Sequence, residues 1–210
     1  VLGCGTVGGG TAKILVEDCE YLKTRTNIPI NLKYIVDVDF SHARAIGLPE
    51  SLYEKDFDKV LNDPEIGVVV ELIGGTTIAR DFIIKALNAG KNVVTANKAL
   101  LAHYGRDLFA LARKNNVVIG FEASCGGGIP IIRALYDGLI SNRNEAIYGI
   151  VNGTCNYILT QMIRNGKTYA EALAEAQRDG ISMRVRADLL NTGIFHISII
   201  ISNELDGIPL

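Results

Sequence analysis

A glycine-rich turn near the start of the chain constrains the fold most. Gly3, Gly5 and Gly8 follow a short apolar pair that is typical of a strand end, and a helical stretch follows them. In this context the first glycine permits a tight turn, the second lets the backbone approach a pyrophosphate, and the third allows close helix–strand packing. A turn without a ligand has the same composition. The context nevertheless favours a dinucleotide site, because free amides at a helix N-terminus attract phosphate.

Strand and helix patterns alternate along the first 123 residues. Near-continuous apolar runs, which are typical of parallel strands buried on both faces, lie at 32–36, 67–73, 92–95 and 117–121. Apolar residues at helical spacing predict helices over 11–20, 79–88 and 105–114, and Gly90 ends the second of them. The alternation predicts an α/β chain with a Rossmann-type doubly wound parallel sheet.

The pattern changes after Glu122, where three consecutive glycines at 126–128 and Pro130 interrupt it. We therefore predict a dinucleotide-binding domain over residues 1–123. Residues 124–210 would form part of a second, incomplete α+β domain for substrate binding and dimerisation. The elements expected there are a strand at 147–151, a turn at Asn152-Gly153, a helix at 157–164, and a helix at 169–179 that begins with a Thr168/Glu171 capping box and ends at Gly180.

Composition excludes several classes of protein. The chain is 48% hydrophobic and 21% charged, the balance of a soluble globular protein rather than of a disordered or collagen-like chain. Its 21 Lys+Arg against 23 Asp+Glu lack the basic excess of a nucleic-acid binder. No apolar run reaches the ~18 residues that a membrane span needs. Four scattered cysteines without a CxxC pair predict reduced thiols in a cytoplasm.

Asp37 follows the apolar run at 32–36 and is the candidate for the acidic residue of the dinucleotide-binding motif. It lies later than the usual spacing of ~20 residues, and the polar stretch at 18–31 predicts an extended helix and loop there. Asp37 would accept a hydrogen bond from the adenosine ribose 2′-hydroxyl, and with Asp39 it would oppose a 2′-phosphate, which favours NAD over NADP. Both aspartates also fit turn or capping roles, Asp39 together with Ser41. Arg44 is placed to swing toward a 2′-phosphate.

Two more loops follow predicted strands, where ligands bind in doubly wound sheets. Gly74, Gly75 and Thr76 form a loop whose backbone amides can contact a cofactor, although a plain tight turn has the same sequence. Lys98 follows the run at 92–95 and can bind phosphate, hold a substrate oxygen or move a proton. An ordinary solvated lysine fits this position equally well.

Five segments in order resemble the homoserine dehydrogenase family. They are Gly3-Cys-Gly-Thr-Val-Gly8, Glu71-Leu-Ile-Gly-Gly75, Val94-Thr-Ala-Asn-Lys-Ala-Leu-Leu101, Phe121-Glu-Ala-Ser-Cys-Gly-Gly-Gly-Ile-Pro130 and Gly149-Ile-Val-Asn-Gly-Thr-Cys-Asn-Tyr-Ile-Leu-Thr160. The resemblance covers residues 1 to about 180. It implies NAD(P)-dependent interconversion of L-homoserine and L-aspartate 4-semialdehyde, a step in threonine, methionine and isoleucine biosynthesis.

The resemblance also implies roles for individual residues. Lys98 would lie beside the nicotinamide and the substrate as the catalytic residue, and Gly153 and Thr154 would contact the substrate. A sodium ion would be held by Glu122 and the backbone of Cys125, Gly127 and Ile129, which are ligand types suited to a hard cation. The expected cofactor contacts, from motifs and resemblance together, are Gly3, Gly5, Thr6, Val7, Gly8, Asp37, Gly74, Gly75, Thr76, Lys98 and Gly180.

The sequence after Gly180 departs from the family pattern. Met183 stands where the resemblance implies a substrate-holding glutamate, Asp188 is poorly spaced, and no lysine follows Lys167. Two alternatives to the enzyme therefore stay open. One is a dinucleotide-binding sensor or partner subunit without turnover, and the other is a dehydrogenase for another small oxo-acid.

The expected strand at 147–151 bears on assembly. A strand left at the edge of a sheet exposes unpaired backbone groups, which pair readily with a second copy. We therefore expect a homodimer formed by sheet pairing. A strand covered by the C-terminal segment is the alternative.

Overall fold

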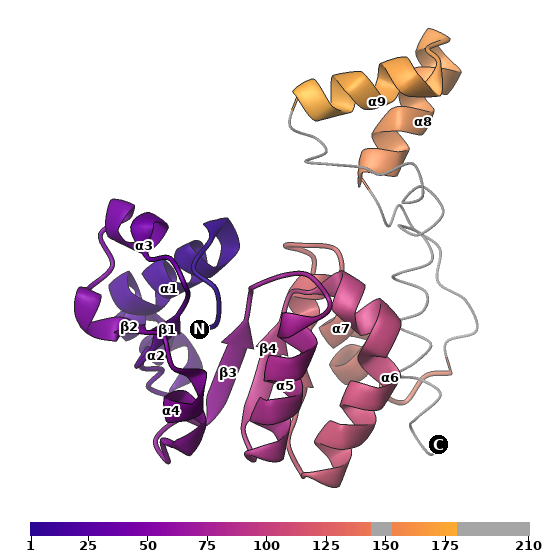
Figure 1. Ribbon diagram of the computed structural model, residues 1–210. Coiled ribbons are helices and arrows are strands. Elements are labelled where there is room, and N and C mark those ends of the chain that lie inside the picture. The colour runs from indigo at the N-terminus through magenta and orange to yellow at the C-terminus, as the bar shows by residue number, and fades with distance from the viewer. Residues whose placement is uncertain (144–152, 180–210) are drawn as a thin grey trace. The chain divides into compact units, whose positions relative to one another are not determined.

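The structure, a computed structural model, describes residues 1–143 and 153–179. Its contacts divide the chain into two compact units, Val1–Ser124 and a second that begins at Cys125 (Figure 1). The boundary expected between residues 123 and 124 lies next to this division. The role expected for each domain stays a prediction.

Parallel pairing joins the strands of the first unit. The strands are β1 (Ile35–Val36), β2 (Tyr53–Glu54), β3 (Val68–Glu71), β4 (Asn92–Thr95) and β5 (Ile119–Gly120). β1 pairs with β2, while β4 lies between β3 and β5. Leu2 bridges Val36 on one side and Glu71 on the other, so the N-terminal segment lies between β1 and β3. The order β2, β1, N-terminal segment, β3, β4, β5 is that of a doubly wound dinucleotide-binding sheet, and it confirms the predicted fold class.

Helices follow the strands in alternation. They are α1 (Thr6–Glu17), α2 (Cys19–Thr26), α3 (Ser41–Ala45), the 3₁₀ turn η1 (Glu50–Leu52), α4 (Phe57–Asn62), α5 (Ile78–Asn88), α6 (Lys98–Lys114) and the 3₁₀ turn η2 (Glu122–Ser124). Right-handed crossovers place α1 and α3 on one face of the sheet and α5 and α6 on the other. In agreement, α1 contacts α3, and α5 contacts α6 and β4 (Figure 1).

Two helices begin earlier than the sequence predicts. α1 starts at Thr6 rather than at residue 11, because its first turns are the glycine motif itself and carry no apolar periodicity. α6 starts at Lys98 rather than at residue 105, because the Asn97 side chain caps it by accepting a hydrogen bond from the Leu100 amide at 3.1 Å. α2 occupies the stretch where an extended helix and loop were expected, and this prediction is confirmed.

Three strands are shorter than the apolar runs that predict them. β1 covers two residues of 32–36, and β5 covers two of 117–121. β3 ends at Glu71 although the run continues to Ile73. The reason is chemical: the Glu71 carboxylate accepts hydrogen bonds from the amides of Ile73 at 2.9 Å and Gly74 at 3.1 Å, which turns the chain out of the ladder.

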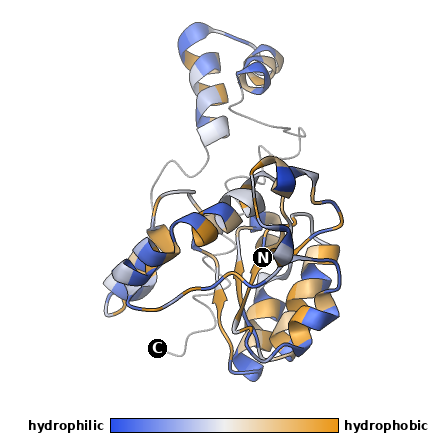
Figure 2. Cartoon of the chain, turned by 90° about the vertical axis from the view of Figure 1, so that its left-hand side faces the viewer, coloured by the Kyte–Doolittle hydropathy of each residue, from blue (hydrophilic) through white to orange (hydrophobic). Residues whose placement is uncertain are grey.

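Apolar side chains from both helical layers bury the sheet. The central strands of the first unit are orange, and thus hydrophobic, in Figure 2. One buried cluster joins the glycine loop, β1 and α3, and its residues are Cys4, Ala12, Ile35, Phe40, Ala43 and Leu48. On α5 and α6, Ile83, Leu87, Leu100 and Leu101 are fully buried. Each such side chain contributes about 1.5–3 kcal/mol, which makes the first unit a rigid base for the loops at its edge.

The elements of the second unit within its described residues 125–143 and 153–179 are helices, joined by irregular segments. Its elements are α7 (Ile131–Arg133), the π-helical turn η3 (Ala134–Gly138), α8 (Gly153–Asn165) and α9 (Tyr169–Arg178). α8 and α9 pack around Ile158, Ala172 and Ala176. The predicted capping box of Thr168 and Glu171 is confirmed at the start of α9. The expected strand at 147–151 and Gly180 lie outside the described residues.

Candidate functional site

The glycine loop between the N-terminal segment and α1 is too tightly packed for side chains at two of its positions. Gly3 has φ +85°, and a Cβ atom there would lie 2.9 Å from the Ile73 nitrogen. A Cβ atom on Gly8 would lie 1.9 Å from the Gly3 carbonyl oxygen. A Cβ atom on Gly5 would meet no described atom within 4 Å. The space in front of Gly5 is therefore open, as close approach of a pyrophosphate requires.

The start of α1 presents its amides to this open space. Gly5 is the N-cap residue and has no side chain that could bond them. The first amides of a helix have no partner within the helix and carry the positive end of its dipole. Thr6 and Val7 lie in this first turn, and the Val7 side chain is 60% exposed. These residues fit a dinucleotide pyrophosphate.

Asp37 ties the end of β1 to the glycine loop. One carboxylate oxygen accepts a hydrogen bond from the Cys4 amide at 2.5 Å, and the other accepts from the amides of Val38 at 2.7 Å and Asp39 at 3.2 Å. A carboxylate offers about four acceptor positions. Three are used, so one position remains for a ribose hydroxyl.

Asp39 and Arg44 have local partners in this structure. Asp39 accepts hydrogen bonds from the Ser41 amide at 2.9 Å and the Ser41 hydroxyl at 2.8 Å, and these bonds lower the pKa of its carboxyl group. Arg44 pairs with Glu50 at 2.9 Å and lies over the Tyr53 ring at 5.8 Å from its centroid. Asp39 thus forms a turn with Ser41, the first residue of α3, whose N-cap residue is Phe40 and has no side-chain cap hydrogen bond. The Arg44–Glu50 pair lies on the surface.

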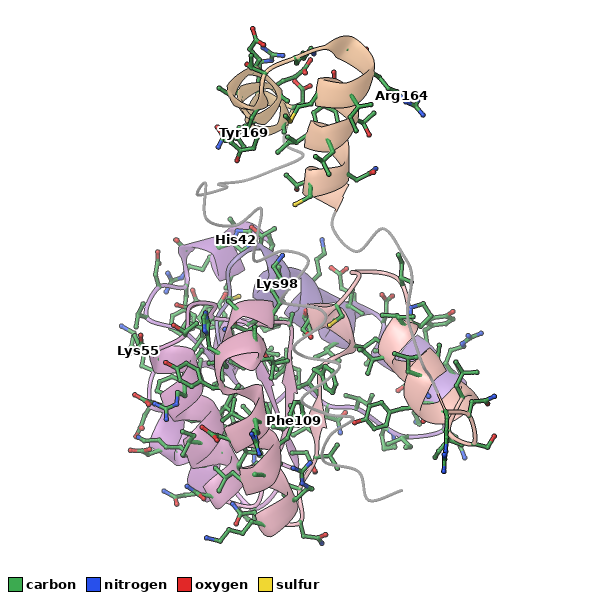
Figure 3. All side chains as sticks on the ribbon, turned by 90° about the vertical axis from the view of Figure 1, so that its right-hand side faces the viewer. His42, Lys55, Lys98, Phe109, Arg164 and Tyr169 are labelled. Atoms are coloured by element: carbon green, nitrogen blue, oxygen red, sulfur yellow. The ribbon has the colours of Figure 1, made fainter. Side chains whose placement is uncertain are left out.

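The loop after β3 and the start of α6 are joined by Asn97. Its side-chain nitrogen donates a hydrogen bond to the Gly75 carbonyl at 2.6 Å, while its oxygen caps α6. Gly74 and Gly75 have φ +80° and +71°, a conformation that favours glycine. Thr76, the next residue, is half-buried. Lys98 is the first residue of α6 and is exposed, and Figure 3 shows it at the same end of the first unit as His42.

Glu71 is a residue to which the sequence analysis assigned no role. It is fully buried, and besides the two amides of its own loop it accepts a hydrogen bond from the Thr95 hydroxyl at 2.7 Å. Thr95 lies directly opposite on β4 and in turn accepts from the Asn97 amide at 3.0 Å. The detectable signal was a carboxylate at the end of the otherwise apolar strand 68–71, because a buried charge is costly unless several donors bind it.

Most of the remaining site residues belong to the second unit. Gly153 is the first residue of α8 and Thr154 the second, so the helix begins four residues before its predicted start at residue 157. Asn152, the other residue of the expected turn, lies outside the described residues. Glu122 is in η2 of the first unit, while Cys125, Gly127 and Ile129 belong to the second. Among the residues that the structure describes, no group of three or more His, Cys, Asp or Glu side chains forms a metal site. None of the helices in these ranges is long and apolar enough to cross a membrane.

The structure thus brings most of the expected cofactor contacts to one edge of one sheet. The loops after the N-terminal segment, β1, β3 and β4 all leave the carboxyl ends of parallel strands. Hydrogen bonds join these loops in pairs, Cys4 with Asp37 and Asn97 with Gly75. This edge spans the point where strand order reverses, which is where doubly wound sheets bind dinucleotides.

Comparison with known proteins agrees with this geometry. Residues 3–122 match the family model described as the NAD binding domain of homoserine dehydrogenase, and residues 130–209 match the homoserine dehydrogenase model. The second match therefore runs beyond residue 180, to which the resemblance seen in the sequence motifs extends.

Individual relatives give the same result. A homoserine dehydrogenase of Neisseria gonorrhoeae is 46% identical over 180 residues, which are 86% of this chain and 41% of that protein. The crystal structure of the Thiobacillus denitrificans enzyme is 41% identical, with a TM-score of 0.82 over 93% of this chain and 45% of that chain. A hyperthermophilic archaeal homoserine dehydrogenase in complex with NADPH is 27% identical, with a TM-score of 0.76 over 95% of this chain and 66% of that chain. This chain belongs to the homoserine dehydrogenase family.

Proposed function

We propose that this chain carries the dinucleotide-binding part of an NAD(P)-dependent homoserine dehydrogenase, which interconverts L-homoserine and L-aspartate 4-semialdehyde. The activity is a proposal because the chain spans less than half the length of the curated relative and of the bacterial structure described above. In the family this step belongs to threonine, methionine and isoleucine biosynthesis, and the same place is proposed here.

One observation carries the proposal: Lys98 starts a helix at the same sheet edge as the open glycine loop. When bound, the nicotinamide cofactor supplies hydride transfer to or from the carbon that bears the substrate oxygen. The exposed Lys98 ammonium would donate a hydrogen bond to that oxygen and stabilise the negative charge that develops on it during reduction. The glycine loop and Asp37 would hold the remainder of the dinucleotide.

We also propose that NAD is preferred over NADP. Asp37 places a negative charge where the adenosine ribose is expected, and a 2′-phosphate there would be repelled. Arg44 pairs with Glu50 on the surface, and such an exposed pair contributes only about 0–1 kcal/mol, so the proposed preference depends on Asp37. Binding of NADPH by the archaeal relative is a property of that protein.

Absorbance at the reduced-nicotinamide band tests the activity. Purified chain mixed with NAD and L-homoserine should produce an absorbance increase in a single turnover. The same experiment with other small 2-hydroxy or 4-hydroxy acids tests the alternative substrates. Dinucleotide binding without any absorbance change, for every substrate, would contradict the proposal.

A dinucleotide-binding protein without turnover is the second candidate. It is favoured by the segment after Gly180, in which Met183 replaces the expected glutamate and no lysine occurs. A lost general acid–base group lowers a rate by about 10²–10⁴. This candidate predicts normal dinucleotide affinity with very slow oxidation of homoserine.

Three further properties remain proposals. A sodium ion at Glu122, Cys125, Gly127 and Ile129 is supported by the donor chemistry of one carboxylate and a glycine-rich backbone, and a sodium-specific rise in melting temperature against potassium would test it. A homodimer is supported by the sequence pattern at 147–151, and sedimentation at micromolar concentration tests it. A cytoplasmic location is supported by four free cysteines.

A further inference from the structure

We propose that Glu71 is a positioning residue for the nicotinamide half of the dinucleotide: its buried carboxylate sets the shape of the Gly74-Gly75 loop and the place of Lys98. The inference rests on the proposed function, since it concerns how the same edge of the sheet holds a dinucleotide. It assigns a role to a buried charge that neither the glycine loop nor Lys98 accounts for.

The first step is the hydrogen bonding of the carboxylate. One oxygen of Glu71 accepts from the amides of Ile73 and Gly74, which fixes the turn that follows β3. The other oxygen accepts from the Thr95 hydroxyl at 2.7 Å. Glu71 is fully buried, so these bonds are not exchanged with water and hold the turn in one conformation.

The second step leads from Thr95 to Lys98. The Thr95 hydroxyl donates its hydrogen bond to Glu71, so the lone pairs of the hydroxyl oxygen are free to accept. The Asn97 amide donates a hydrogen bond to this oxygen at 3.0 Å. Asn97 then bonds the Gly75 carbonyl at 2.6 Å and caps the helix that Lys98 begins. The chain of bonds is closed, since it starts and ends on the loop after β3.

The third step is the location of this closed chain. Asp37, the ribose candidate, lies at the end of β1 on one side of the N-terminal segment. Glu71 and Thr95 lie on the other side, on β3 and β4. A dinucleotide that spans the reversal point has its adenosine half on the Asp37 side, so Glu71 supports the opposite, nicotinamide half.

The test uses Glu71→Gln, which keeps the shape of the side chain and removes the acceptor for the hydrogen bond from the Thr95 hydroxyl. The glutamine oxygen must face the two loop amides, so its amide nitrogen faces Thr95. An amide nitrogen cannot accept a hydrogen bond, so the Thr95 hydroxyl loses the acceptor for its hydrogen. Thr95→Val removes the same link from the other side with a side chain of similar shape, and it serves if the glutamine variant does not fold.

Tyr34→Phe is the matched control. It removes one partly buried hydrogen bond, from the Tyr34 hydroxyl to Asp63 at 2.9 Å. Tyr34 immediately precedes β1 and Asp63 lies before β3, so this bond is at the opposite, amino-terminal edge of the same sheet. The control therefore reports what a general loss of stability does to binding.

Titrations with NADH and with ADP, which lacks the nicotinamide riboside, separate the outcomes. Glu71→Gln and Thr95→Val should each weaken NADH binding about tenfold and leave ADP binding within twofold, and at saturation the emission of bound NADH should shift less than in the unmutated chain. Tyr34→Phe should change neither affinity nor emission. Equal weakening for both ligands, or no weakening for either, would overturn the inference. Failure of the unmutated chain to bind NADH would instead overturn the proposed function.

Discussion

The amide of Cys4 donates a hydrogen bond to the carboxylate of Asp37 at 2.5 Å. This contact joins two segments that are 33 residues apart in the sequence, the glycine loop and the end of β1. The residue expected to recognise the ribose therefore also holds the loop expected to recognise the pyrophosphate. A change at Asp37 should act on both.

Asp37→Ala should narrow the preference for NAD over NADP. Loss of the charge removes the repulsion of a 2′-phosphate, and loss of an acceptor for the ribose hydroxyl weakens NAD binding by about tenfold. Calorimetric titration of both cofactors measures the ratio of the two affinities. Asp37→Asn is the control, because it removes the charge and keeps one acceptor oxygen. Indistinguishable titrations of NAD and NADP with the unmutated chain would contradict the assignment.

Gly8→Ala should prevent the loop from forming. The new methyl group would lie 1.9 Å from the Gly3 carbonyl oxygen, which is backbone and cannot move aside. We expect the free energy of unfolding to fall by more than about 3 kcal/mol, measured by urea denaturation followed by circular dichroism.

Gly10→Ala is the matched control for this substitution on the same helix. A Cβ atom there would meet no described atom within 4 Å, so the gain in helix propensity should raise stability by up to about 1 kcal/mol. Equal effects of the two alanines would show that the glycine loop is not packed as described.

The positions of strands were readable from the sequence, but their ends were not. Runs of β-branched residues predicted β3 and β4 because such runs pack on both faces of a sheet. The run at 67–73 overstated β3, since a single side chain, Glu71, takes the amides that would have continued the ladder. Likewise, the start of α6 depends on one capping bond from Asn97. Bonds of this kind are set by three-dimensional contacts and leave no periodic pattern.

Part of the candidate site could likewise be predicted from the sequence, and part could not. The glycine motif predicted the tight turn before α1, because a Cβ atom at Gly3 or Gly8 would collide with neighbouring backbone atoms. The link between Glu71 and Thr95 was missed, because 24 residues separate them and only the register of β3 with β4 brings them together.

The chain should lose stability as the pH falls from about 4 to about 2. A hydrogen bond from Lys33 lowers the pKa of Asp63 to about 2, and one from Lys59 lowers the pKa of Glu54 to about 2. Ordinary values are about 3.9 and 4.3 in an unfolded chain. A carboxyl group whose pKa is lower in the folded state stabilises that state above its unfolded pKa, and this contribution disappears as pH falls through the folded pKa.

Melting temperature against pH measures this loss. Asp63→Asn should reduce the slope between pH 4 and pH 2, because the variant has no proton to take up at that position. Lys33→Met should reduce the same slope, since the pKa of Asp63 would return toward its ordinary value without its main donor. An unchanged slope in both variants would show that other groups control the acid transition.

Lys98→Ala should slow turnover strongly without harming the fold. Lys98 is the first residue of α6, and a positive charge at a helix N-terminus opposes the helix dipole by about 0.3–1 kcal/mol. The alanine variant should therefore melt at the same or a higher temperature, while kcat falls by about 10²–10⁴ and the KM for the dinucleotide changes little.

Lys114→Ala at the other end of α6 is the control, because a cation there stabilises the helix. It should melt lower and keep its activity. If Lys98→Ala retained kcat, or lost activity only in proportion to a lower melting temperature, Lys98 would have no part in the chemistry.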